Sequence, residues 1–152
     1  MADYQYDLVI IGSGPAGEGA AMKAVKQGWS VAVVDERPMV GGNCTHLGTI
    51  PSKALRHSVR RMVQFNNMPM FRSVGEPHWC SFAEVMKAAD EVIRKQVDGR
   101  TREYSRNRIR LHFGHAAFVD QNTLTIKKAD STSDKIEGKH FLIATGSSPY
   151  HP

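Results

Sequence analysis

The feature that most constrains the fold is a strand, a glycine-rich turn, a helix and a second strand in immediate succession near the N-terminus. Residues 8–11, Leu-Val-Ile-Ile, form the continuous aliphatic run that is typical of a strand buried on both faces of a parallel sheet. The turn Gly-Ser-Gly-Pro-Ala-Gly follows at residues 12–17, and small side chains then recur at helical spacing until Gly28. Residues 31–34 repeat the aliphatic run. This order is one βαβ unit and predicts an α/β fold around a parallel sheet.

The spacing of the glycines in the turn indicates a site for a dinucleotide. Gly12 permits a tight turn, Gly14 lets the backbone approach a pyrophosphate, and Gly17 allows the helix to pack closely on the strand. The helix begins at Pro15 and Ala16, and its unpaired N–H groups and positive dipole end would face the phosphates. Three glycines by themselves are a weak pattern, since a plain turn also uses them. Here the pattern has a strand before it and a helix after it, as a dinucleotide site requires.

An acidic residue at the end of the second predicted strand completes the pattern. Asp35 stands eighteen residues after Gly17 and can accept hydrogen bonds from both ribose hydroxyls of an adenosine. Glu36 and Arg37 follow it at the same end of the predicted site. The alternative for Asp35 is an acid exposed at the end of a strand. The pattern therefore predicts an adenine dinucleotide without choosing between FAD and NAD.

The rest of the chain predicts two long helices followed by short strands. One helix begins near Pro51, with Thr49 or Ser52 as its cap, and runs to about residue 65. Residues 66–76 are predicted to be a loop. Ser81, with a glutamate three residues later, predicts a capping box at the start of a helix that continues toward residue 104. Strands are predicted at 109–113, 115–119, 123–126 and 136–143, with a hairpin turn over 129–134.

Composition excludes several classes of protein. The 152 residues suffice for one hydrophobic core, and two cysteines are too few for a secreted disulfide scaffold. The apolar run at 8–11 is too short to span a bilayer, so no membrane partner is expected. Because the N-terminus lacks the basic segment of a signal peptide, we expect a cytoplasmic protein. The net charge is +5, but the basic residues are accompanied neither by cysteines and histidines at zinc-ligand spacing nor by a series of aromatic residues that could stack on bases. No nucleic-acid partner is therefore expected.

Three further motifs resemble the flavoprotein disulfide reductases. Residues 41–53, Gly-Gly-Asn-Cys-Thr-His-Leu-Gly-Thr-Ile-Pro-Ser-Lys, resemble the family's segment beside the isoalloxazine ring of FAD. Residues 114–116, Gly-His-Ala, resemble its Gly-x-Ala element at the adenine end, and residues 144–147, Ala-Thr-Gly-Ser, resemble the turn that closes the first part of its FAD domain. With the glycine turn, four motifs occur in the family's order. The resemblance implies a Rossmann-like FAD-binding domain, incomplete, with a parallel sheet, helices and a small antiparallel β element.

The resemblance implies FAD as the cofactor and no metal. No catalytic residue is certain, but the lysine matched by Lys53 lies near flavin N5 in the family, where a cation would stabilise reduced flavin. Outside the motif, Lys53 would be interpreted as an exposed lysine in a first helical turn. The predicted cofactor-binding residues are Gly12, Gly14, Pro15, Ala16, Gly17, Asp35, Glu36, Arg37, Gly42, Asn43, Cys44, Thr49, Lys53, His115, Ala116, Thr145 and Gly146.

Thr49 separates this chain from most of that family. The family's redox disulfide joins two cysteines five residues apart, which match Cys44 and Thr49 here. A threonine forms no disulfide, so the electron relay to thiol substrates is absent; Cys44 alone is either a reactive thiol or an inert one. One branch of the family lacks the second cysteine and transfers hydride from NADPH to NAD⁺ through FAD. Several segments of this chain, including Pro-Tyr-His-Pro at residues 149–152, are similar to that branch.

The implied function is the FAD-binding part of such an oxidoreductase. Residues 1–152 match only the first part of the family's FAD domain, so the nicotinamide-binding and dimerisation domains are expected to be absent. We therefore expect a fragment that is inactive alone and is homo-oligomeric when full length. The alternatives are a non-catalytic dinucleotide-binding fragment, a flavoprotein like dihydrolipoamide or mercuric reductase, and a truncation that does not fold stably.

Overall fold

The fold is built on one mixed sheet, seen in the computed structural model, which describes residues 4–73 and 75–148. The strand order is β3-β2-β1-β6-β5-β4. The parallel half joins β3, β2, β1 and the end of β6, while β4, β5 and the start of β6 form an antiparallel meander. The strands are β1 (Tyr6–Ile11), β2 (Val31–Asp35), β3 (Arg110–Phe113), β4 (His115–Phe118), β5 (Thr123–Lys127) and β6 (Ser133–Ile143).

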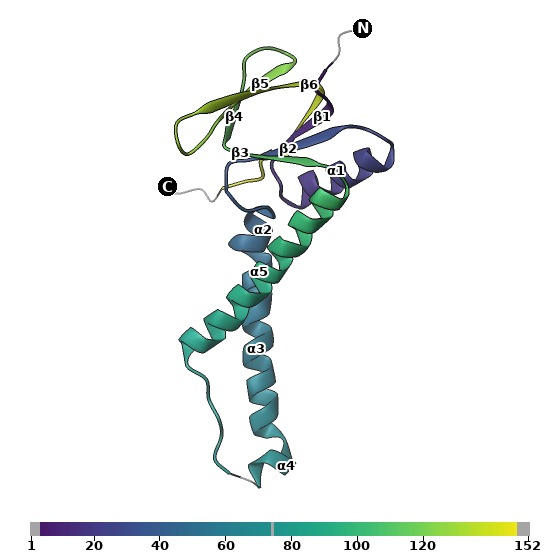
Figure 1. Cartoon of the computed structure of the whole chain (residues 1–152). Coiled ribbons are helices and arrows are strands. Elements are labelled where there is room, and N and C mark those ends of the chain that lie inside the picture. The colour runs from purple at the N-terminus through teal and green to yellow at the C-terminus, as the bar shows by residue number, and fades with distance from the viewer. Residues whose placement is uncertain (1–3, 74, 149–152) are drawn as a thin grey trace.

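The strand β6 joins the two halves because it is long enough to have two partners. Its first residues, 133–137, pair antiparallel with β5, and residues 138–143 run parallel to β1. The change of partner falls at Gly138, where an added Cβ would lie 2.7 Å from a methyl carbon of Val9. A single strand thus turns the meander over one face of the parallel sheet (Figure 1).

Two hydrophobic clusters fill the faces of the parallel sheet. On one face, Ile10 and Val33 pack with buried residues of two helices, α1 (Pro15–Lys26) and α5 (Phe82–Arg106). On the other face, Val9 and Val34 pack under the meander against residues such as Ile126. The alternation of successive side chains between the two clusters is what a strand buried on both faces requires. The parallel-sheet prediction from residues 8–11 and 31–34 is therefore confirmed.

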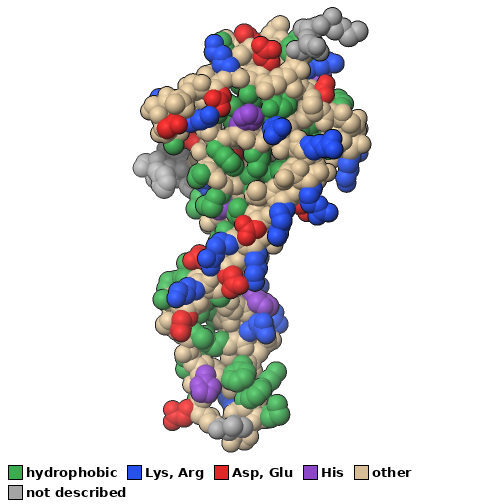
Figure 2. All heavy atoms as spheres, viewed as in Figure 1, with side chains coloured by type: hydrophobic (Ala, Val, Ile, Leu, Met, Phe, Trp, Pro, Cys, Tyr) green, Lys and Arg blue, Asp and Glu red, His purple; other side chains and the backbone are tan. Residues whose placement is uncertain are grey.

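A helical hairpin extends away from the sheet (Figure 1). It consists of α3 (Thr49–Asn67), the short α4 (Pro69–Arg72) and the distal part of α5, which packs along α3. Hydrophobic side chains gather at its tip in Figure 2, where Met68 and Met70 are exposed. In the described part of the chain, no helix combines the length and apolarity that crossing a bilayer requires.

The capping box predicted at Ser81 is confirmed. The Ser81 hydroxyl oxygen accepts a hydrogen bond from the Glu84 N–H at 3.3 Å, and the Glu84 carboxylate accepts one from the Ser81 N–H at 2.7 Å. These contacts satisfy two donors that the first turn of a helix otherwise leaves unpaired, and they also hold the pKa of Glu84 below its usual value.

Two local predictions between residues 41 and 76 are wrong, and one element there was not predicted. The cap of α3 is the backbone of Gly48, and the Ser52 hydroxyl instead donates to the Thr49 carbonyl at 3.1 Å. A short helix that the sequence did not indicate, α2 (Gly42–His46), forms in the segment after the glycine pair. The predicted loop at 66–76 contains α4, because Pro69 starts a new turn one residue after α3 has ended.

Candidate functional site

A cavity of about 410 Å³ opens where β1, β2 and β6 end. The carboxyl ends of parallel strands are the usual position for a ligand in open α/β sheets, and this volume is within the range of small-molecule sites. All of the predicted cofactor-binding residues except Gly17, Thr49 and Lys53 line it. They are Gly12, Gly14, Pro15, Ala16, Asp35, Glu36, Arg37, Gly42, Asn43, Cys44, His115, Ala116, Thr145 and Gly146.

Backbone rather than side chains forms the floor of this cavity. Gly12 has φ +110°, and a Cβ there would collide with the carbonyl oxygen of Ala144 at the end of β6. Gly42 has φ +61°, and its Cβ would lie 2.8 Å from the Cα of Gly14. Both conformations favour glycine, and both close contacts exclude any side chain. The two turns are therefore packed against neighbouring backbone and leave their outer surface to a ligand.

The N-terminus of α1 points its first turn at the cavity. Gly14 is the N-cap, no side chain caps the helix, and Pro15 occupies the first helical position. The remaining N–H groups of the first turn suit an anion such as a pyrophosphate. Glu18 in the same turn would oppose an anion, but its carboxylate accepts a hydrogen bond from Arg100 Nε of α5 at 2.9 Å. The ion pair offsets the negative charge close to the helix end.

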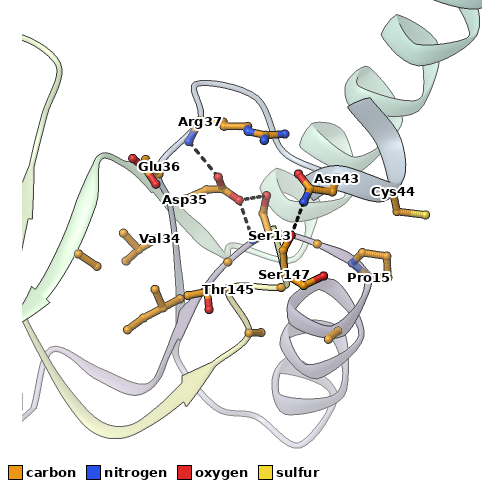
Figure 3. A pocket seen from close by; sticks show the side chains of 18 of the residues that line it. Ser13, Pro15, Val34, Asp35, Glu36, Arg37, Asn43, Cys44, Thr145 and Ser147 are labelled. Carbon is orange, nitrogen blue, oxygen red and sulfur yellow. Dashed lines mark hydrogen bonds between the residues drawn. The ribbon is translucent and has the colours of Figure 1, made fainter. Parts of the chain in front are cut away.

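Asp35 is held at the other side of the turn by three donors (Figure 3). Its Oδ2 accepts hydrogen bonds from the Ser13 N–H at 2.8 Å and from the Ser13 hydroxyl at 2.5 Å. Its Oδ1 accepts one from the Arg37 N–H at 2.9 Å. The carboxylate is half-buried and lines the cavity, so it remains available to a ligand hydroxyl. Glu36 is exposed and lies 4.0 Å from Nδ1 of His115, across the adenine end predicted from the sequence.

The opposite end of the cavity brings together two segments about a hundred residues apart in sequence. Asn43 in α2 donates from Nδ2 to the Ser147 carbonyl at 2.8 Å (Figure 3). Cys44, beside it, is a half-buried free thiol that lines the cavity. Thr145 and Gly146 follow β6 on the same side, and Gly146 has φ +77°. The motif at residues 41–53, which resembles the family's flavin-side segment, and the Ala-Thr-Gly-Ser turn at residues 144–147 therefore meet here.

Three predicted residues lie outside the cavity lining. Gly17 is buried beneath the turn, where a Cβ would collide with the Gly12 carbonyl oxygen, so it serves the helix–strand packing predicted for it. Thr49 and Lys53 are exposed in the first turns of α3. Their contact with a cofactor stays a prediction. Among the residues that the structure describes, no cluster of three or more histidine, cysteine or acidic side chains is placed to hold a metal ion.

Some lining residues were missed from the sequence. Ser13 occupies the variable position of the Gly-x-Gly turn, where the pattern carries no residue preference, yet it is fully buried and contacts Asp35. Ser147, the last residue of the predicted turn at 144–147, and Ser148, which follows it, also line the cavity. The sequence indication for Ser147 was its place at the end of the Ala-Thr-Gly-Ser motif. The resemblance at residues 149–152 lies outside the described residues.

Comparison with known proteins agrees with this geometry. Residues 6–152 match the family described as "Pyridine nucleotide-disulphide oxidoreductase". The whole chain is 61% identical to a soluble pyridine nucleotide transhydrogenase of Azotobacter vinelandii and 60% identical to one of Pseudomonas fluorescens. In both cases it covers 33% of the relative, so the chain spans about a third of the length of the curated relatives that it matches.

Solved structures show the same fold. A copper(II) complex of RclA, an HOCl-induced flavoprotein disulfide reductase of Escherichia coli, superposes with a TM-score of 0.79 at 26% identity, over all of this chain and 30% of that one. LpdA of Mycobacterium tuberculosis superposes with a TM-score of 0.83 at 23% identity, over 95% of this chain and 32% of that one, and shows the fold alone. The motif order, the cavity at the strand ends and the match over residues 6–152 together establish that the chain belongs to the pyridine nucleotide-disulphide oxidoreductase family.

Proposed function

We propose that this chain is the FAD-binding part of an Si-specific NAD(P)⁺ transhydrogenase, which transfers hydride from NADPH to NAD⁺ without a redox disulfide. The observation that carries the proposal is the cavity with a backbone floor, an acid at one end and an unpaired thiol at the other. The 61% identity to a soluble pyridine nucleotide transhydrogenase supports the same activity. FAD, when bound, supplies the hydride-accepting and hydride-donating chemistry.

From one end of the cavity to the other, its residues have the groups needed to bind the adenosine ribose, the pyrophosphate and the flavin of FAD. Asp35 would accept hydrogen bonds from the adenosine ribose, and the first turn of α1 would bind the pyrophosphate with its N–H groups. Gly12 and Gly42 allow the turns that line this part of the cavity to pack against neighbouring backbone, because any Cβ at either position would meet backbone atoms. Asn43 would hold the segment after β6 against α2 at the flavin end through its bond to Ser147.

Thr49 favours transhydrogenation over disulfide reduction. A hydroxyl neither closes a disulfide with Cys44 nor carries electrons, so hydride would return from the flavin to a second nicotinamide rather than pass to sulfur. Both cysteines of the chain, Cys44 and Cys80, are free thiols in the structure. Lys53, in the second turn of the same helix, is proposed to place positive charge near the flavin.

We also propose that the 152 residues do not catalyse the reaction alone. They span about a third of the length of the curated relatives. In the longer protein, nicotinamide binding and dimerisation would depend on residues other than these 152. The substrates would then be NADPH and NAD⁺, acting on a homo-oligomer of the longer protein. A cytoplasmic location remains a prediction.

Two measurements test the proposal. Purified chain incubated with FAD and passed through a desalting column is expected to retain the flavin absorbance, whereas retention of NAD in place of FAD would favour a dinucleotide-binding module of another kind. The chain, and a longer protein that contains it, would then be assayed for hydride transfer from NADPH to the thionicotinamide analogue of NAD⁺. Turnover by the longer protein alone is expected. Turnover by the 152-residue chain would refute its inactivity, and thiol-dependent reduction of a disulfide by the longer protein would favour a reductase.

A further inference from the structure

Ser13 is fully buried at a point where three segments of the site meet. It lies in the turn after β1, contacts Asp35 at the end of β2, and contacts Gly41 at the start of α2. The cofactor-binding pattern gives this position no role, because it is the variable residue between two glycines. A buried hydroxyl in such a place must have hydrogen-bond partners, and these partners determine its orientation.

The hydrogen bonds of Ser13 give its hydroxyl a single direction. Its oxygen accepts a hydrogen bond from the Gly41 N–H at 3.1 Å, so its one proton is free for the Oδ2 of Asp35. The Ser13 N–H donates to the same oxygen at 2.8 Å. Two donors from one residue therefore occupy Oδ2 of the carboxylate.

The remaining oxygen of Asp35 is partly occupied as well. Oδ1 accepts the Arg37 N–H at 2.9 Å. An ionised carboxylate has about four lone-pair directions. With three of them used by Ser13 and Arg37, roughly one direction is left, on Oδ1, for a hydroxyl in the cavity.

We propose that Ser13 is a positioning residue that orients Asp35 so that the carboxylate accepts one hydroxyl of the adenosine ribose rather than both. The inference rests on the proposed FAD site and narrows the expectation that Asp35 accepts both hydroxyls. Ser13 acts through Asp35 and does not itself contact the ribose. Removal of the Ser13 hydroxyl frees one acceptor direction on Oδ2, in addition to the one already free on Oδ1. The carboxylate can then also rotate, so its discrimination between the two ribose hydroxyls decreases.

The fold is expected to tolerate removal of the hydroxyl. In Ser13→Ala the Gly41 N–H keeps the Ser13 carbonyl as an acceptor at 3.2 Å, and Asp35 keeps the Ser13 N–H. No buried donor is therefore left without a partner. Ser13→Cys is a second variant of similar size whose thiol is a weaker donor, and it is expected to give the same effect to a smaller degree.

Ser30→Ala is the matched control. The Ser30 hydroxyl donates to Oδ2 of Asp7 at 2.7 Å, and the Ser30 N–H donates to the same oxygen at 2.8 Å, which repeats the Ser13–Asp35 arrangement. This pair joins the starts of β1 and β2, at the edge of the sheet opposite to the cavity, and it is exposed. Ser30→Ala therefore removes the same kind of hydrogen bond without touching the cavity.

The experiment is a double-mutant cycle between the protein hydroxyl and the ribose hydroxyls. Calorimetric titration would give the affinities of ADP, 2′-deoxy-ADP and 3′-deoxy-ADP for the unaltered chain, Ser13→Ala, Ser13→Cys and Ser30→Ala. In the unaltered chain, deletion of one ribose hydroxyl is expected to weaken binding by roughly 10-fold or more, as for a hydrogen bond to a charged group, and deletion of the other by less than about 3-fold. In Ser13→Ala the larger penalty is expected to shrink by at least about 3-fold, and in Ser30→Ala it is expected not to change.

Other outcomes overturn the inference in distinguishable ways. If Ser13→Ala weakens all three ligands by the same factor, Ser13 supports only the fold. If the two deletions are equally costly in the unaltered chain, Asp35 does not select one hydroxyl. If ADP binds with the expected pattern but FAD does not bind, the proposed flavin function fails while the role of Ser13 stands. If neither ADP nor FAD binds, both fail.

Discussion

Alanine at Gly42 provides a sensitive test of the backbone floor of the site. Gly42 begins α2 with φ +61°, in the left-handed region, and its Cβ would lie 2.8 Å from the Cα and 3.4 Å from the N of Gly14. Cβ atoms essentially never approach backbone closer than 3.0 Å, so the turn at Gly14 or the start of α2 must shift. Since both turns line the cavity, the same shift moves the groups proposed to hold the pyrophosphate.

The cost has two parts. An L-residue in the left-handed conformation is less stable by about 1–2 kcal/mol, and relieving an overpacked contact costs about 1–3 kcal/mol. We expect Gly42→Ala to lower the free energy of unfolding by about 2–5 kcal/mol, which at about 2–4 °C per kcal/mol lowers the Tm by about 4–20 °C for a chain of this size. The affinity for FAD is expected to fall at least about 10-fold, because 1.4 kcal/mol of lost contact free energy is sufficient for that change.

Gly19→Ala is the matched control. Gly19 lies in the exposed face of α1, and a Cβ there would meet no atom within 4 Å. The same chemical change should raise the free energy of unfolding by about 0.5–1 kcal/mol, because alanine favours a helix interior over glycine. Thermal melting by circular dichroism and FAD titration measure both variants. Tm and FAD affinity of Gly42→Ala within error of the unaltered chain would refute the argument from φ and close contact.

Three further predictions concern other parts of the chain. Ser81→Ala removes the capping box with Glu84 and should cost about 1 kcal/mol in thermal or urea unfolding, without changing FAD affinity; an unchanged midpoint would contradict it. Arg100→Gln leaves the half-buried Glu18 carboxylate unpaired beside the first turn of α1, so it should weaken FAD binding, and Glu18→Gln in the same chain should restore part of the affinity. The pKa of His112 is lowered by burial, so the unfolded chain binds a proton first as the pH falls through about 6.5, and stability should decrease on acidification from pH 8 to 5. In His112→Gln that decrease in Tm should be smaller, and an equal decrease would exclude His112 as its source.

The parallel half of the fold was predictable because its pattern is local and repeated. Residues 8–11 and 31–34 are aliphatic on both faces, and only a strand covered on both sides requires that. The glycine turn between them is constrained by its own backbone, as the positive φ of Gly12 shows. The position of the site followed from these elements, since the end of a parallel strand is where the turn and Asp35 must meet. The capping box at Ser81 was predictable for the same reason, because all of its contacts lie within three residues.

The connections were not predictable because their structure depends on residues distant in sequence. The helix α2 is only five residues long, less than two turns, so apolar periodicity cannot indicate it. It is fixed instead by contacts such as Asn43 to Ser147 and Gly42 against Gly14. The break between α3 and α4 depends on the backbone of Met68 becoming extended before Pro69, which the sequence indicates only as a disfavoured helical conformation before a proline.

Ser13 shows why the least informative position of a motif can carry the most specific contact. The glycines on either side are constrained by sterics that hold for any dinucleotide, so they indicate a class of ligand and no more. The intervening side chain faces whatever the second strand presents, which in this chain is a carboxylate one strand away at the same sheet edge. Specificity for one ribose hydroxyl would then depend on the pair formed by residues 13 and 35 rather than on the acid alone. Loss of the Ser13 hydroxyl should therefore weaken the preference between 2′-deoxy-ADP and 3′-deoxy-ADP even though Asp35 is retained.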